Sequence, residues 1–269
     1  MKSMAWCLTA AACAAGAILS GCSQKSETIK LPGDVPLEMV WVPEGSFFMG
    51  SPDTEQDRAA TEGAQHAAIV GGFWMGRYEL TKRQWTAVMG TTPWQGNANV
   101  LDDPDSPAVL VSWNNMKDFI TALNGLTGKA FQLPSEVQWE YACRAGTTTR
   151  CYWGDDAGYT EINDYAWWNG NAVPAGELYA HVVGQKRPNA FGLYDMNGNV
   201  WEFCEDDWHT SYTGAPTDGS AWVNSPRSTN RVARGGAWST DGYACRSAAR
   251  AFGAPNGLSV IVGFRVVRL

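Results

Sequence analysis

The chain has 269 residues and a formal net charge of −7 at pH 7. Its 14 Trp and 29 Gly residues favour a compact, loop-rich fold held by large aromatic side chains over a helical bundle. The acidic balance, with no basic cluster among aromatic residues, argues against nucleic-acid binding. We find no internal repeat or linker and expect a single domain.

The N-terminal segment is typical of an export signal. Lys2 precedes an apolar, Ala-rich run over residues 10–19, which is too short to span a bilayer comfortably. The run ends in Leu19-Ser20-Gly21-Cys22, which resembles the bacterial lipobox, where the cysteine is acylated and begins the mature chain. We therefore expect a lipoprotein signal peptide over residues 1–21, a lipid on Cys22, a tether over residues 22–32, and a location in the cell envelope, at its outer surface. The alternative is an ordinary cleaved signal with an unrelated cysteine.

Three strands and three helices are predicted in the first half of the remaining chain. The strands cover residues 38–43, 46–50 and 72–79. Thr81 is expected to cap the first helix, over residues 82–89, which Gly90 ends. Ser112 begins the second helix, and Ser135 is expected to cap the third. The second helix has an apolar face at three-to-four spacing, made by Trp113, Met116, Phe119, Ile120 and Leu123. Residues 146–190 contain turns and little periodicity, so the pattern indicates an α+β fold with long loops.

Four cysteines remain after the signal segment, namely Cys143, Cys151, Cys204 and Cys245. Their spacing matches no zinc site. In an exported protein they could be two buried thiols or form one bridge, and the sequence leaves the pairing open.

Four segments, in order along the chain, resemble the formylglycine-generating enzyme (sulfatase-modifying factor) domain family. They are Met39-Val40-Trp41-Val42-Pro43-Glu44-Gly45 with Phe48-Met49-Gly50-Ser51; Leu133-Pro134-Ser135-Glu136 with Trp139-Glu140-Tyr141-Ala142; the run from Asn189 to Glu202; and Arg234-Gly235-Gly236 with Cys245-Arg246 and Gly263-Phe264-Arg265. The resemblance implies a C-type lectin-like fold over residues 33–269, with a small antiparallel sheet, two helices and long loops.

The founding members of that family oxidise a sulfatase cysteine with copper and oxygen. They use two cysteines, separated by four residues, shortly after the Gly-Gly turn, because a thiolate pair holds Cu(I) well. After Gly235-Gly236 this chain has Cys245 alone. We therefore expect no copper and no catalytic residue. The alternative is a formylglycine-generating or related oxidase that acts on exported proteins, with Cys204 or Cys151 completing the site in space.

Residues 231–269 resemble the variable region of diversity-generating retroelement proteins built on this fold. The resemblance assigns a constant frame to Arg231, Arg234, Gly235, Gly236, Trp238, Cys245, Arg246, Pro255, Gly263, Phe264, Arg265, Val266 and Val267. The positions around this frame show neither strand nor helix periodicity, which is typical of a presented surface. They predict contacts to a protein or glycan ligand at the cell surface, with Tyr243 and Phe252 as the aromatic anchors. The predicted contact residues are Trp238, Ser239, Thr240, Asp241, Tyr243, Ala244, Ala249, Ala251, Phe252, Ala254, Asn256, Ser259, Val260 and Ile261. The alternatives are plain loop residues of a lipoprotein and a purely structural envelope protein.

A turn near residue 200 matches a calcium site of the family. The match implies side-chain ligands from Asp195 and Glu202 and carbonyl ligands from Gly198 and Val200, the hard oxygens that calcium takes. The alternative is the same turn without metal.

Other groups are expected to have structural roles. We interpret His66, His181 and His209 as surface or hydrogen-bonded side chains, and Trp167-Trp168 as core rather than a sugar platform. The run Glu205-Asp206-Asp207 is predicted to be a solvated acidic loop.

Overall fold

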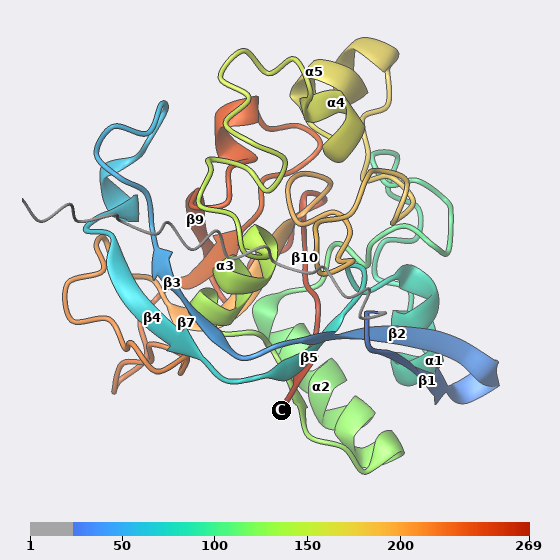
Figure 1. Cartoon of the computed structure of the whole chain (residues 1–269). Helices are drawn as coiled ribbons and strands as arrows, with labels where there is room; N and C mark the ends of the chain where they lie inside the picture. The colour runs from blue at the N-terminus through green and yellow to red at the C-terminus, as the bar shows by residue number, and fades with distance from the viewer. Residues whose placement is uncertain (1–23) are drawn as a thin grey trace, which may run out of the picture.

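The computed structural model describes residues 24–269. The predicted signal peptide and Cys22 lie outside this range. Two sheets, a separate hairpin and three longer helices make up the described chain, with long connections between them (Figure 1).

The first sheet is antiparallel and has the strand order β1-β2-β5-β11-β6. Its strands are β1 (Ser26–Leu31), β2 (Val35–Val42), β5 (Phe73–Gly76), β6 (Phe131–Gln132) and β11 (Val267–Arg268). The prediction of a tether over residues 22–32 is wrong from Ser26 onward. Residues 26–31 pair with β2 along their whole length, because Ile29 and Leu31 alternate into the core.

The second sheet has the order β10-β7-β8-β9 and includes the parallel pair β10–β7. Its strands are β7 (Trp201–Asp207), β8 (Arg231–Arg234), β9 (Arg250–Gly253) and β10 (Val262–Gly263). The strands β3 (Gly45–Met49) and β4 (His66–Val70) pair with each other as a separate hairpin. The three strands predicted from the sequence are confirmed with shifted ends, and the four strands of the second sheet were not predicted.

The three predicted helices are confirmed as α1 (Lys82–Met89), α2 (Trp113–Thr127) and α3 (Glu136–Arg144). Thr81, Ser112 and Ser135 each accept a hydrogen bond from the backbone N–H three residues on, as their capping role requires. The remaining helical turns are short: α4 (Ile162–Tyr165), α5 (Asn169–Ala172), and the 3-10 turns η1 (Pro32–Asp34), η2 (Ala60–Glu62), η3 (Val173–Ala175) and η4 (Gly242–Ala244).

Large aromatic side chains join the aliphatic residues of the core. The ring of Phe119 on α2 stacks on Trp85 of α1, with centroids 5.4 Å apart, and meets Phe264 edge-on at 5.6 Å. On the other side of the first sheet, every residue of α3 is buried, and Trp139 is completely enclosed. The helices, the two sheets and the long connections confirm the predicted α+β class. Within residues 24–269, no helix has the length and apolar content needed to cross a bilayer.

Candidate ligand-binding surface

The predicted frame residues of the C-terminal block are held by buried ion pairs. The guanidinium of Arg234, on β8, is fully enclosed and bonds the carboxylate of Glu140 on α3 and the carbonyl of Ala249. Arg246 forms a two-bond pair with Glu62, at 2.6 Å and 2.8 Å. Because a buried charge is stable only when it is paired and hydrogen-bonded, these arginines fix the path of the block.

Eleven of the fourteen predicted contact positions are at least partly accessible to solvent. Asp241, Tyr243, Phe252, Ala254 and Asn256 are exposed. Ser239, Thr240, Ala251, Ser259, Val260 and Ile261 are half-buried. We call these eleven residues the C-terminal surface.

Three predicted contact residues do not belong to this surface, because their side chains are buried. They are Trp238, Ala244 and Ala249. Trp238 packs with Val200 and Val109, and the carbonyl of Ala249 accepts a bond from Arg234. Their predicted role in ligand contact is therefore corrected.

Main-chain hydrogen bonds hold the exposed segments in place. The carbonyl oxygens of Pro255, Ser259 and Ile261 accept bonds of 2.9–3.0 Å from the backbone N–H groups of Asn114, Leu110 and Trp201. In the same way, the N–H of Asn169 donates to the carbonyl of Thr240 at 3.0 Å. Backbone bonds of this kind do not depend on side-chain identity. The hydroxyls of Thr240 and Ser259 add side-chain bonds to the main chain at Ala237 and Ile261.

Phe252 packs against Trp208, which is not among the contact residues predicted from the sequence. Its ring is 55% exposed and lies 4.7 Å from the half-buried ring of Trp208. Arg250 also contacts Trp208, with its guanidinium carbon 4.6 Å from the centroid of the indole ring. Tyr243 on η4 is 53% exposed, and its carbonyl is held by Arg246 Nε at 2.8 Å. The surface thus offers two aromatic side chains on a fixed backbone.

The predicted calcium ligands form a buried turn whose contacts do not fit that role. Both carboxylate oxygens of Glu202 accept bonds from Arg265, at 2.6 Å and 2.7 Å, and one also accepts a bond from Trp139. Asp195 accepts a bond from the Gly184 N–H and keeps one oxygen without a protein partner, and its burial raises its pKa to about 6. The sequence also missed Glu79, whose oxygens bond Asn199 and the Val200 N–H behind this turn. A cation at Glu202 would have to displace the Arg265 guanidinium, so we derive no function through calcium.

All four cysteines of the described chain are free and buried. Cys151 donates its S–H toward the Cys245 carbonyl at 3.7 Å, and Cys143 toward the Asn197 side chain at 3.4 Å. Burial raises the pKa of Cys245 to about 12, an effect that the hydroxyl of Thr240 opposes only in part. Thr240 stands five residues before Cys245, where the second cysteine of an oxidising pair would be.

The acidic run after Trp201 is not a loop, and its prediction as a solvated segment is wrong. Residues 205–207 complete β7. Asp207 is buried and pairs with Arg227 at 3.0 Å and Arg231 at 2.7 Å. Asp206 accepts backbone N–H bonds from Glu136 and Trp222, and its burial raises its pKa to about 7.

The histidines have hydrogen-bonded, structural surroundings. His181 lies 2.9 Å from Glu177 and stacks on Trp167 at 3.7 Å, and burial lowers the pKa of its imidazole. His209 stacks on Trp222 at 3.6 Å. Trp167 and Trp168 are half-buried rather than core residues.

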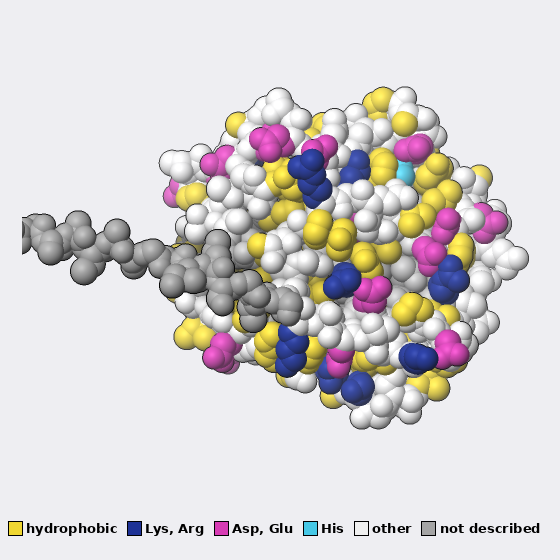
Figure 2. All heavy atoms as spheres, turned by 45° about the vertical axis from the view of Figure 1, so that its right-hand side comes forward, with side chains coloured by type: hydrophobic (Ala, Val, Ile, Leu, Met, Phe, Trp, Pro, Cys, Tyr) yellow, Lys and Arg dark blue, Asp and Glu magenta, His cyan; other side chains and the backbone are white. Residues whose placement is uncertain are grey.

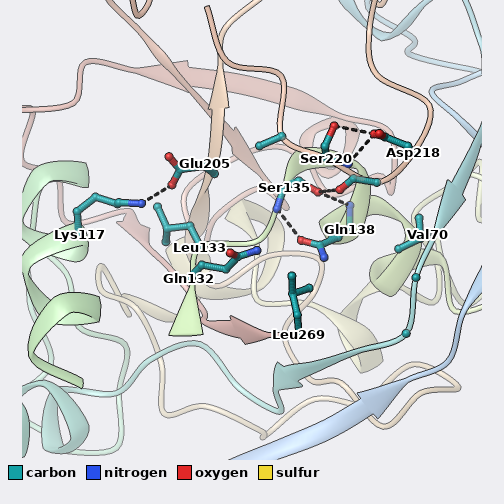
Figure 3. A pocket seen from close by; sticks show the side chains of 14 residues that line it. Val70, Lys117, Gln132, Leu133, Ser135, Gln138, Glu205, Asp218, Ser220 and Leu269 are labelled. Carbon is teal, nitrogen blue, oxygen red and sulfur yellow. Dashed lines mark hydrogen bonds and ion pairs between the residues drawn. The ribbon is translucent and has the colours of Figure 1, made fainter. Parts of the chain in front are cut away.

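A cavity of about 600 Å³ lies away from the C-terminal surface, between the β4–β5 turn, α3 and β7 (Figure 3). Its polar side chains are bonded to one another: Lys117 to Glu205 at 2.7 Å, and Ser220 to Asp218 at 2.6 Å. None of its lining residues is among the predicted contacts. On the face shown in Figure 2, charged side chains of both signs are scattered among hydrophobic ones and form no basic stripe.

Four relatives are informative. The chain is 28% identical to the chaperone protein LppX of Paenibacillus barcinonensis, over 95% of this chain and 96% of that protein. It is 27% identical to the formylglycine-generating enzyme of Thermomonospora curvata, over 87% and 94% of the two chains. Among solved structures, PvdO from Pseudomonas aeruginosa superposes with a TM-score of 0.79 at 33% identity, over 90% and 97% of the two chains. Treponema denticola variable protein 1 superposes with a TM-score of 0.78 at 23% identity, over 90% and 98%, and shows the same fold.

The family comparison covers almost all of the described chain. The model of the sulfatase-modifying factor enzyme 1-like domain matches residues 26–269. This range begins with β1, in agreement with the corrected start of the domain. The chain belongs to the sulfatase-modifying factor enzyme 1-like domain family.

Proposed function

We propose that this chain is a lipid-anchored binding protein of the cell envelope, which takes a protein or glycan ligand on its C-terminal surface. The observation that carries the proposal is the division within residues 231–269. Most of the frame is buried and its arginines are held by ion pairs, whereas the eleven residues of the C-terminal surface are exposed or half-buried, and backbone bonds hold several of them. This division lets one scaffold present different side chains.

The chemistry of the C-terminal surface suits recognition. Tyr243 and Phe252 supply large contact area at a small cost in side-chain entropy, and Asp241 and Asn256 add polar groups near them in the sequence. The name of the relative LppX describes a chaperone, which is also a protein that works by binding another.

The sulfhydryl chemistry argues against the alternative of a formylglycine-generating oxidase. Such a site needs thiolates within reach of copper and substrate. Here Cys245 is completely buried, its pKa is raised to about 12, and Thr240 stands in place of a second cysteine. Cys151 offers its S–H to a backbone carbonyl rather than to the Cys245 sulfur.

Binding to arrays of glycans and purified envelope proteins tests the proposal. The variants are Tyr243→Ala with Phe252→Ala, and the control is Leu126→Ala, an equally exposed side chain on α2. We expect any ligand of the native protein to lose at least about tenfold in affinity with the double variant and nothing with the control. Unchanged binding by the double variant would refute the surface. Oxygen uptake with copper and a Cys-x-Pro-x-Arg peptide, abolished by Cys245→Ser, would favour the oxidase.

A further inference from the structure

The folded domain begins very close to the predicted lipid. Gln24, two residues after Cys22, already bonds the Trp41 carbonyl through its side-chain amide at 2.7 Å. The N–H of Trp41 donates to the Lys25 carbonyl at 2.9 Å. Two extended residues reach about 7 Å at most. A lipid on Cys22 would therefore hold the surface around Trp41 within one side-chain length of the bilayer.

The surface at this place has the residue types that lie at a membrane interface. Trp41 on β2 and Trp74 on β5 meet edge-on, with centroids 5.5 Å apart, and both are half-buried. Lys25 Nζ lies 4.9 Å and 5.1 Å from the two rings. Arg268, which is paired with Glu27, lies over the Trp74 ring at 5.5 Å. The next residue, Leu269, is 73% exposed and lines the cavity of Figure 3, so it adjoins this face without belonging to it. Indole rings beside lysine and arginine are enriched where a bilayer meets water.

We propose that this Trp41–Trp74 face, made by Lys25, Trp41, Trp74 and Arg268, rests on the lipid headgroups and fixes the orientation of the domain on the membrane. The inference rests on the lipid anchor of the proposed function. The short connection between Cys22 and Gln24 keeps this face near the bilayer. The two indole rings and their cationic neighbours then contact the headgroups. A long flexible tether would allow any face to approach the bilayer, whereas a two-residue connection to a strand does not.

This orientation leaves the C-terminal surface free. In Figure 1 the β1–β2 hairpin and β9, which carries Phe252, lie on opposite sides of the molecule. A bilayer beside the start of β1 thus leaves Phe252 toward the solvent, where a large ligand can reach it.

Fluorophore accessibility on vesicles tests the orientation. The full lipidated chain is reconstituted into vesicles of phosphatidylethanolamine and phosphatidylglycerol. A fluorophore is attached in Leu269→Cys and, as the matched control, in Leu258→Cys, an exposed leucine of the C-terminal block. We expect iodide to quench the label at 269 several-fold less than the label at 258 on vesicles, and both labels equally in detergent. Twelve Gly and Ser residues inserted between Ser23 and Gln24 should remove the difference.

Two results would overturn the inference, and they differ in meaning. Equal quenching at both positions on vesicles, with the protein retained there, would refute the orientation and leave the anchor and the ligand surface standing. Failure of the chain to stay on vesicles, or retention that survives Cys22→Ser, would refute the anchor itself. Ligand binding by Tyr243 and Phe252 is measured independently of either result.

Discussion

The ring of Phe252 rests on Trp208, with the two centroids 4.7 Å apart, although 44 positions separate the residues in the sequence. Phe252 is 55% exposed, while Trp208 packs against the core and also contacts Arg250. We therefore expect Phe252→Ala to change the free energy of unfolding by less than about 0.5 kcal/mol and Trp208→Ala to lower it by about 1–3 kcal/mol. Urea unfolding of both variants measures the difference. A large loss with Phe252→Ala would mean that this residue is part of the core.

The buried ion pair between Arg246 and Glu62 should contribute strongly to the free energy of unfolding. Both side chains are almost completely buried, so removal of one leaves an unpaired charge inside the protein. Arg246→Met should lower the free energy of unfolding by about 3–5 kcal/mol. The control is Arg83→Met, which breaks an exposed pair with Asp105 and should give no measurable change. Equal effects from the two variants would show that the buried frame is not what holds the block.

The stability of the fold should depend on Asp206. Burial raises the pKa of its carboxyl from 3.8 to about 7, so the folded state retains a proton that the unfolded chain releases. The contribution of Asp206 is complete below pH 3.8 and is lost as the pH rises through 7. Asp206→Asn should flatten the fall in stability over this interval, relative to the native protein. Parallel pH profiles for the two proteins would contradict the assignment.

The four thiols should be unreactive in the folded protein. Burial raises the pKa of Cys143 and of Cys245 to about 12, and it also raises the pKa values of Cys151 and Cys204. A thiol reagent such as Ellman's reagent should therefore label none of them at pH 8 and all four after unfolding in urea. Fast labelling of Cys245 in the native state would reopen the question of redox chemistry.

Calcium should have little effect on the turn at residue 200. If calcium bound only the folded state, it would stabilise that state by about 2.7 kcal/mol at a calcium concentration one hundred times the Kd. Because Arg265 occupies both oxygens of Glu202, we expect the thermal midpoint to be the same in calcium and in EGTA. A rise in the midpoint that Glu202→Gln abolishes would restore the metal site.

The capped helices were predictable from the sequence because their signals are local. Thr81, Ser112 and Ser135 each precede a partner three residues on, and all three caps form. The second sheet was not predictable in this way. β8 is buried at every position, and β10 has two residues, so neither has an alternating pattern.

The resemblance of the C-terminal block predicted the candidate surface in outline. The wrong predictions, for the buried contact residues and for Glu202, have a common cause. An alanine occurs equally in buried and in exposed positions, so the sequence does not distinguish Ala249, which is buried, from Ala251, which is half-buried. The role of Glu202 depends on Arg265, a partner 63 residues away. Such long-range pairings appear only when the chain is folded.

Residues 262–268 contribute one strand to each of the two sheets. β10 pairs with β7 in one sheet, and β11 lies between β5 and β6 in the other. A product shortened by a premature stop before Val262 would lack an edge of one sheet and an inner strand of the other. Because such a truncation removes both pairings at once, we expect the shortened chain not to fold into this domain.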